Sequence, residues 1–306
     1  MTTYIIKRLL SIVPTMLGVA LLVFMMIHIM PGDPARIIGG MEADAAQLES
    51  IRESLGLHDP LHIQFYDFVS GAIRGDFGRS FSTRVPVTEE IFERMPKTFL
   101  LAVSGVVLAV TIGLTAGVIA AKHHQQPLDN LVMVGAMFGV SMPSFWFGLM
   151  LIVIFAVTLG WFPTSGSGTW RHLVLPCMAL GIRAAAILAR LTRSSMLEVM
   201  QSDFVRTARG KGLSESVITY KHVLRNSLIP VVTIVGLQIG RLLAGTVIIE
   251  QVFSWPGLGR LLIRSLMARD FPMIQGIILY IALAFVLVNL AVDLFYSVLD
   301  PRIQYS

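Results

Sequence analysis

Apolar residues dominate six separate stretches of the chain, and each stretch is long enough to cross a bilayer as one helix. About 20 helical residues span the roughly 30 Å of hydrocarbon in a membrane, and helices are required there because the bilayer offers no water to unpaired backbone groups. The predicted spans are residues 9–30, 98–121, 131–159, 172–190, 228–250 and 273–299. The pattern therefore predicts an all-α membrane protein with six transmembrane helices.

The loop between the first two spans, residues 31–97, has a helical pattern of its own. Leu48, Ile51 and Leu55 form one apolar stripe, and a second stripe runs over 63–73 and ends before Gly75. We expect a small helical insertion over the outer face of the membrane. It would serve either as a docking surface or only as a cap on the helix bundle.

A second long loop, residues 191–227, is basic. Its segment 203–213 mixes charged and small residues, and the segment 217–228 alternates apolar and basic residues at helical spacing. Two helices separated near Gly210 and Gly212 fit this pattern. Such helices either lie on membrane lipid or are presented to a cytoplasmic partner, and the pattern leaves both interpretations open.

These elements divide the chain into an anchor helix (1–30), the insertion (31–97), a five-helix core (98–299) that contains the loop 191–227, and a tail (300–306). The basic residues ahead of the first apolar run resemble the start of a secretion signal. That run is too long for a signal, however, and it lacks a small-x-small cleavage site. We therefore interpret it as a retained anchor.

Lysine and arginine in the short loops set the expected orientation, because such loops stay on the cytoplasmic side. With the loop 31–97 set aside, one side of the predicted bundle carries Lys7, Arg8, Lys122, Arg190, Arg193, Arg206, Arg209, Lys211, Lys221, Arg225 and Arg302. The other side carries only Arg171, Arg260, Arg264 and Arg269. Both termini are therefore predicted to be cytoplasmic.

Composition excludes several classes of protein. Hydrophobic residues make up 55% of the 306 positions and charged residues 14%, against about 25% charged in soluble domains. This balance excludes a disordered chain and a charged nucleic-acid binder, so no nucleic-acid partner is expected despite the net charge of +5. Cys177 is the single cysteine and cannot form an internal disulfide.

The sequence contains no recognisable motif for catalysis or nucleotide binding. The segment 210–212 (GKG) lacks the upstream glycine and the following Ser or Thr of a phosphate-binding loop. His58 and His62 could share a helix face, but no third ligand is evident, so no metal site is expected. We therefore predict that the chain is not an enzyme and that its energy comes from a partner subunit or an ion gradient.

Charges inside the predicted spans are the most informative single residues, because an ionised group near the bilayer centre costs roughly 2.5–3.5 kcal/mol on insertion. Arg183 and Arg241 fall near mid-depth of two antiparallel spans. We interpret them as lining an aqueous path and attracting a substrate carboxylate. Pairing with a partner chain or snorkelling is the alternative.

The third span carries Ser141 and Pro143 near its middle, and the proline should kink the helix beside such a path. Asp293 lies near the inner end of the last span, at a depth similar to that of Arg190 and Arg193. We expect a structural ion pair between Asp293 and these arginines.

A series of motifs runs along the whole chain: Met30–Ala35, Gly75–Gly78, Ser141–Phe145, Ala189–Val199, Arg206–Leu213, Leu224–Pro230, Phe253–Arg260, Val292–Leu294 and Asp300–Ile303. In this order they resemble the permease subunits of bacterial binding-protein-dependent ABC importers of the peptide/nickel group. Within this group the chain is most similar to the permeases that import glutathione, dipeptides or oligopeptides. The segments 34–36, 42–45 and 159–164 carry the similarity to the glutathione-importing members.

The resemblance implies the type I importer permease fold, located in the bacterial inner membrane. It also implies that the chain forms half of a translocation path with a second, similar permease. Two ATPase subunits, which bind ATP and Mg²⁺, would dock on the cytoplasmic side, and a substrate-binding protein would dock outside. No cofactor is expected on this chain itself.

The family's Glu-Ala-Ala-x-x-x-Gly signature aligns with the segment from Arg206 to Gly212, where Arg206 replaces the glutamate. The resemblance therefore assigns contact with the ATPases to this segment, namely Arg206, Thr207, Ala208, Arg209, Lys211, Gly212 and Leu213. We expect a helix of exposed small residues there.

Import of small peptides is the function that these observations favour. A nickel importer of the same architecture would favour His or acidic residues along its path rather than two arginines. An ion-coupled secondary carrier would show inverted repeats and a carboxylate-based ion site in mid-membrane, and the sequence shows neither.

Overall fold

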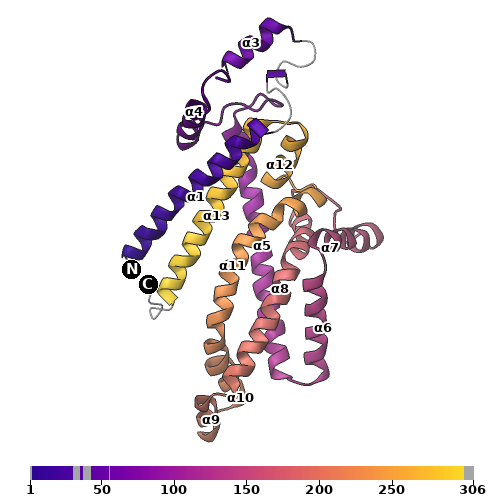
Figure 1. Cartoon of the computed structure of the whole chain (residues 1–306). Coiled ribbons are helices and arrows are strands. Elements are labelled where there is room, and N and C mark those ends of the chain that lie inside the picture. The colour runs from indigo at the N-terminus through magenta and orange to yellow at the C-terminus, as the bar shows by residue number, and fades with distance from the viewer. Residues whose placement is uncertain (1, 30–34, 37–42, 55, 300–306) are drawn as a thin grey trace. The chain divides into compact units, whose positions relative to one another are not determined.

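The computed structural model describes residues 2–29, 35–36, 43–54 and 56–299, with side chains in these ranges except at 2–9, 51, 54 and 293–299. The described part is almost wholly helical (Figure 1), with one isolated antiparallel bridge between Arg79 and Pro86. Its helices are α1 (Thr2–Ile29), α3 (Ala45–Ser54), α4 (Leu61–Ile73), α5 (Val87–Lys122), α6 (Pro127–Ser141), α7 (Ser144–Leu151), η1 (Ile152–Thr158), α8 (Trp170–Met200), α9 (Asp203–Gly210), α10 (Glu215–Val217), η2 (Ile218–Val223), α11 (Leu224–Val252), α12 (Leu258–Met267) and α13 (Phe271–Leu299). The predicted all-α class is confirmed.

Within the described residues, five stretches of helix are long and apolar enough to cross a membrane, and one bent pair of helices would make a sixth. α1, α5, α8, α11 and α13 account for five of the predicted spans. All five are longer than predicted, and the extension is greatest where α5 begins at Val87 and where α8 continues to Met200. Parts of the two long loops are therefore extensions of the spans.

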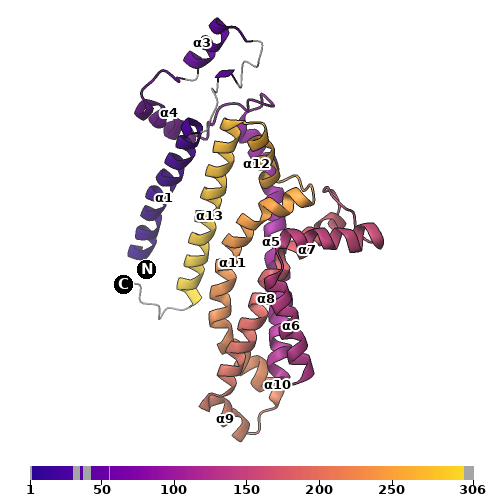
Figure 2. The same cartoon turned by 45° about the vertical axis from the view of Figure 1, so that its right-hand side comes forward.

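The third predicted span, 131–159, is not one helix. Met142 and Pro143 adopt extended backbone, with ψ of 131° and 134°, and the axes on the two sides of this break differ by 108° (Figure 2). Proline lacks an N–H group and disfavours helical geometry in the residue before it. The prediction of a distortion at Pro143 was right in position, but the distortion is a break between two helices and not a kink within one.

The chain forms two compact units, residues 1–96 with 257–306 and residues 97–256. In the first unit α1 packs along α13 and against α4. The two helices predicted in the loop 31–97 are present as α3 and α4, and glycines with positive φ follow each of them, Gly56 at 64° and Gly75 at 76°. The apolar core of this unit consists of Val87, Ile91, Leu258, Leu261, Met273 and Ile277.

A buried carboxylate holds a turn of the first unit. Asp270 is 2% exposed, and it accepts hydrogen bonds from the Ser80 hydroxyl and from the backbone N–H groups of Phe81 and Ser82. The Met273 N–H, in the first turn of α13, donates to the same side chain. Asp270 thereby connects the 80–84 turn to the start of α13.

In the second unit α8 packs against α6, α7 and α11, and it approaches α5 closely. A Cβ atom added at Gly113 or Gly117 of α5 would lie 2.6 Å from the Cβ of Leu188 or Thr192 of α8. Glycines four residues apart let two helix backbones approach in this way. The side of α8 that faces α5 is therefore fixed.

Candidate transport path and coupling surface

α8 has two opposite faces: one packs against α5, and the other is exposed. Gly181 lies against the Gly105 carbonyl of α5, and Leu188 lies against Gly113. Arg183 follows Gly181 by two residues, which is roughly 200° around a helix with 3.6 residues per turn. Arg183 and Arg190 are accordingly exposed on the face opposite α5.

α11 has the same arrangement. Glu250 is fully buried and accepts a hydrogen bond of 2.7 Å from the Thr98 hydroxyl of α5. Arg241 precedes Glu250 by two and a half turns and so projects from the opposite side of α11, where it is exposed together with Leu237 and Ile248. Arg241 therefore also points away from α5.

The two arginines also lie at the same depth. A Cβ added at Gly245 of α11 would lie 3.3 Å from Leu180 Cδ1 of α8, which fixes the register of the two helices. From that contact toward the α9 end, Arg183 is three residues away and Arg241 four, or about 4.5 and 6 Å at 1.5 Å per residue. Because α8 and α11 pack side by side, Arg183 and Arg241 project from one face at one level.

A cavity of about 190 Å³ lies between Arg183 and the break after α6. Phe138, Gly139, Met142 and Ser144 form part of its wall. Ser141 and Pro143 flank Met142 and are exposed. The structure therefore brings the Arg183 side chain next to the backbone break that contains the other two predicted path residues.

Arg193 is bound by a carboxylate that the sequence reasoning missed. Its Nε and Nη2 atoms lie 2.6 and 2.7 Å from the two oxygens of Asp129, a residue in the first turn of α6. Asp129 also accepts the N–H of Gln125 at 3.1 Å and contacts the His124 ring at 3.3 Å. This network ties the α5–α6 turn to α8.

Asp129 takes up Arg193 in a two-pronged contact, whereas the sequence predicted a contact of Arg193 with Asp293. The Asp293 side chain itself lies outside the described residues, so its role as a structural charge stays a prediction. Arg190 is exposed and lines a groove of about 520 Å³ with Ile187 and Ser194. Asp129 lies two residues before the predicted span 131–159, so the local sequence carried no signal for this pair.

The predicted coupling segment forms helix α9 and the turn that follows it. The Leu213 N–H donates to the Ala208 carbonyl and the Gly212 N–H to the Arg209 carbonyl, and Gly212 has a φ of 77°. This is the Schellman arrangement, which favours glycine at the position with positive φ. Two helices divided near Gly210 and Gly212 are thus confirmed.

α9 packs one face on its own unit and leaves the other exposed. Val205 and Ala208 are buried against Val118, Met196 and Ile218. Arg206, Thr207, Arg209, Lys211 and Leu213 are exposed, and so is Phe204, an aromatic side chain that was not predicted as a contact. The expectation of exposed small residues is therefore wrong at Ala208, because its methyl group is part of the core under α9.

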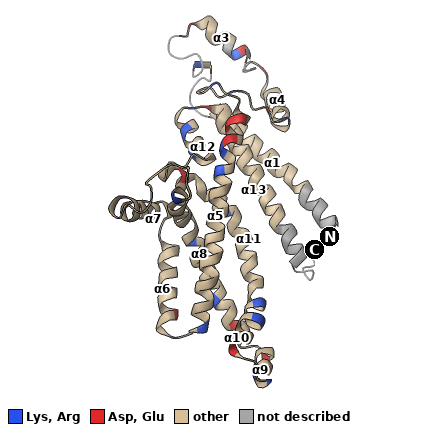
Figure 3. Ribbon diagram, turned by 180° about the vertical axis from the view of Figure 1, so that it is seen from behind, with Lys and Arg blue, Asp and Glu red and all other residues tan. Residues whose placement is uncertain are grey.

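Charge is concentrated around this exposed face. Lys and Arg lie at α9 and around the start of α11 (Figure 3). Arg209 donates to Glu215 at 2.9 Å across the turn, and this hydrogen bond raises the pKa of Arg209. The Arg209–Glu215 pair closes the turn, whereas Arg206 remains largely surrounded by solvent at 85% side-chain exposure.

The histidines considered as metal ligands do not converge on a site. His58 lies 2.8 Å from Glu49 of α3. In the part of the chain that the structure describes, no group of three His, Cys, Asp or Glu side chains could hold a metal ion.

Comparison with known proteins agrees with this architecture. Residues 113–305 match the family model of the binding-protein-dependent transport system inner membrane component, and residues 1–102 match the model of its N-terminal part. The glutathione transport system permease protein GsiC of Escherichia coli K12 is 48% identical over 306 residues, which is all of both chains. The GsiC protein of Shigella dysenteriae serotype 1 is equally similar.

Two solved structures share the fold. A chain of the inward-facing MetNI methionine ABC transporter aligns with a TM-score of 0.58 at 18% identity, over 69% of this chain and 96% of its own. A chain of an amino acid ABC transporter with histidines aligns with a TM-score of 0.53 at 18% identity, over 71% and 95%.

The fold is thus that of an ABC importer permease. The chain belongs to the family of binding-protein-dependent transport system inner membrane components. It is a multi-pass inner-membrane transport subunit, and its family works with ATPase and substrate-binding partners.

Proposed function

We propose that this permease subunit imports glutathione or closely related small peptides. The full-length similarity to GsiC supports this substrate class. The observation that carries the proposal is the placement of Arg183 and Arg241 on one open face at one depth. A tripeptide of this kind has carboxylates, and guanidinium groups bind carboxylates through paired hydrogen bonds.

The open face of α8 and α11 forms this chain's half of the path, and a second, similar permease supplies the other half. Arg183 and Arg241 draw the anionic peptide into the path. Ser141 and Pro143 mark the broken backbone beside it. A partner is needed because a single open face does not enclose a route for a charged solute through hydrocarbon.

In this proposal both termini and α9 are cytoplasmic, as the distribution of Lys and Arg in the short loops supports. Two ATPase subunits bind the exposed face of α9, from Phe204 to Leu213. ATP and Mg²⁺ bind to those subunits and not to this chain. A substrate-binding protein docks on the opposite side, at the insertion that contains α3 and α4.

Movement would pass from the ATPases through the core under α9. Val205 and Ala208 pack on the ends of α5 and α8, so displacement of α9 displaces those two helices. Rocking of packed helices about a site at the midplane is one of the known modes of alternating access.

The test is ATP-driven uptake of labelled glutathione into liposomes that contain the complete transporter and its binding protein. We expect Arg183→Met and Arg241→Met each to weaken the apparent affinity for substrate about tenfold, because tenfold is about 1.4 kcal/mol and a hydrogen bond to a charged group contributes about 1.5–3 kcal/mol. The lysine variants should lose less, since they keep the charge.

Arg171→Met is the matched control. Arg171 is exposed in the first turns of α8, 5.8 Å from the Trp170 ring, and should leave the affinity unchanged. Wild-type affinity in both Met variants would remove the arginines from the path. If the wild-type complex takes up another peptide but not glutathione, the proposed substrate is wrong and the proposed path stands.

A further inference from the structure

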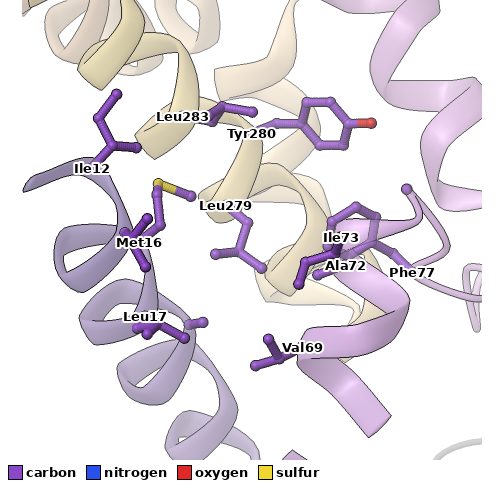
Figure 4. A pocket seen from close by; sticks show the side chains of 13 residues that line it. Ile12, Met16, Leu17, Val69, Ala72, Ile73, Phe77, Leu279, Tyr280 and Leu283 are labelled. Atoms are coloured by element: carbon purple, nitrogen blue, oxygen red, sulfur yellow. The ribbon is translucent and has the colours of Figure 1, made fainter. Parts of the chain in front are cut away.

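An apolar pocket in the unit formed by residues 1–96 and 257–306 is not used by the proposed path. It has a volume of about 500 Å³ and lies between α1, α4 and α13 (Figure 4). Tyr280 is the single lining residue with a polar side-chain group. The other lining positions are Ile12, Val13, Met16, Leu17, Ala20, Val69, Ala72, Ile73, Gly75, Phe77, Leu279 and Leu283.

The pocket is elongated along the membrane-spanning helices. Its wall on α1 runs from Ile12 to Ala20, which is about 12 Å at 1.5 Å per residue. On α13 it includes Leu279 and Leu283, one turn apart. Both stretches lie inside candidate spans, so this wall stands at the depth of the hydrocarbon.

Water is a poor occupant of such a space. A buried water molecule needs two to four polar partners, and cavities lined by apolar side chains stay dry or take up apolar ligands. Leu17 is 45% and Ile73 is 82% exposed, so both side chains are accessible to an apolar molecule. In a bilayer the abundant apolar molecule of elongated shape is a lipid acyl chain.

A cation follows the lining residue Ile73 at the end of α4. Arg74 lies between the lining residues Ile73 and Gly75 and is exposed. Its Nε and Nη2 atoms donate to the carbonyl and the hydroxyl of Ser70 at 3.1 and 3.2 Å, which orients the guanidinium. Among the described residues no carboxylate pairs with Arg74. An oriented guanidinium is well suited to bind a phosphate group.

We propose that this pocket binds one membrane phospholipid, with an acyl chain between α1 and α13 and the phosphate on Arg74. The elongated apolar walls match the acyl chain, and the exposed cation next to Ile73 matches the charge of the headgroup. The lipid fills the space between the periplasmic helix α4 and the two spans. The proposal is independent of the transported substrate.

The first test uses the complete transporter in liposomes that contain a phosphatidylglycerol with a photoreactive diazirine in its acyl chain. After irradiation, mass spectrometry should find the lipid attached to peptides that contain the pocket residues of α1 and α13. Ala72→Trp or Met16→Trp should reduce this labelling about tenfold, which corresponds to about 1.4 kcal/mol, because the indole ring takes up space that the acyl chain would fill. Leu22→Trp, on a 73% exposed position of α1 away from the pocket, should leave the labelling unchanged.

A second test separates the lipid from a protein occupant and examines the headgroup. With benzoylphenylalanine in place of Leu283, irradiation should yield a lipid adduct, and an adduct with another subunit would overturn the proposal. Arg74→Gln should lower the occupancy of phosphatidylglycerol, whereas Arg79→Gln, also at an exposed arginine, should not. Equal labelling of all lipid-facing peptides would also refute a defined site.

Discussion

Loss of Arg193 should destabilise the protein more than loss of its partner, Asp129. The Asp129 side chain is 1% exposed, whereas that of Arg193 is 24% exposed. Arg193→Met leaves a carboxylate in the interior with the Gln125 N–H and the His124 ring as its nearest polar groups. Removing one member of a buried ion pair in this way costs about 3–5 kcal/mol.

Asp129→Asn should have a smaller effect. The guanidinium that remains is partly in contact with solvent, and it can still donate to the amide oxygen of the new asparagine. The expected cost is that of an imperfectly satisfied polar group, about 1–3 kcal/mol. The double variant should recover part of the loss, because neither charge is then left alone.

The assay is thermal unfolding of the purified transporter complex in detergent for the wild type, both single variants and the double variant. Arg171→Met serves as the control, because this arginine is exposed in the first turns of α8, and surface substitutions change stability by about 0.5 kcal/mol or less. Equal losses in the two single variants, or a double variant whose loss is the sum of both, would refute the assignment of the buried charge.

Three further predictions follow from the packing. Gly113→Ala places a methyl 2.6 Å from the Leu188 side chain and should lower the unfolding temperature, at a cost of about 1–3 kcal/mol; Gly135→Ala meets nothing within 4 Å and should maintain or raise it. Ala208→Glu should lower stability, since it buries an unpaired charge under α9. Thr207→Glu should leave stability intact and reduce the amount of substrate transported per ATP hydrolysed. An unchanged ratio of transport to ATP hydrolysis in Thr207→Glu would exclude this face as the ATPase contact. Asp270→Ala should expose the 80–84 turn to trypsin, because the backbone N–H groups of Phe81 and Ser82 lose their acceptor. Unchanged digestion would show that other contacts hold the turn.

The sequence predicted the helices well, because the apolar composition of each span leaves few alternatives to a helix. Uninterrupted apolar runs of membrane length can only be helices, and Gly210 and Gly212 end α9 at the place that their spacing indicates. The family motifs added the role of α9, which periodicity alone left open between a lipid surface and a partner. Arg183 and Arg241 were recognisable because charges are rare within spans.

Other features depend on distances between elements and were therefore not predictable from local pattern. Asp129 and Arg193 are far apart in sequence, and nothing in either segment indicates which partner is taken. Ala208 has the small size expected at a contact surface, but its burial depends on Met196 and Ile218. Pro143 predicts a disturbed helix, while the 108° angle is set by how α7 packs on α8.

The break at Pro143 has a consequence for solvation. Wherever a helix ends, its last carbonyl groups and the first amides of the next helix have no intrahelical partner, and hydrocarbon cannot supply one. The backbone between α6 and α7 therefore needs hydration or protein donors at a level where the other spans need none. In the proposed path, this uncharged stretch of main chain beside Arg183 would let a peptide exchange its water shell for carbonyl and amide groups in steps.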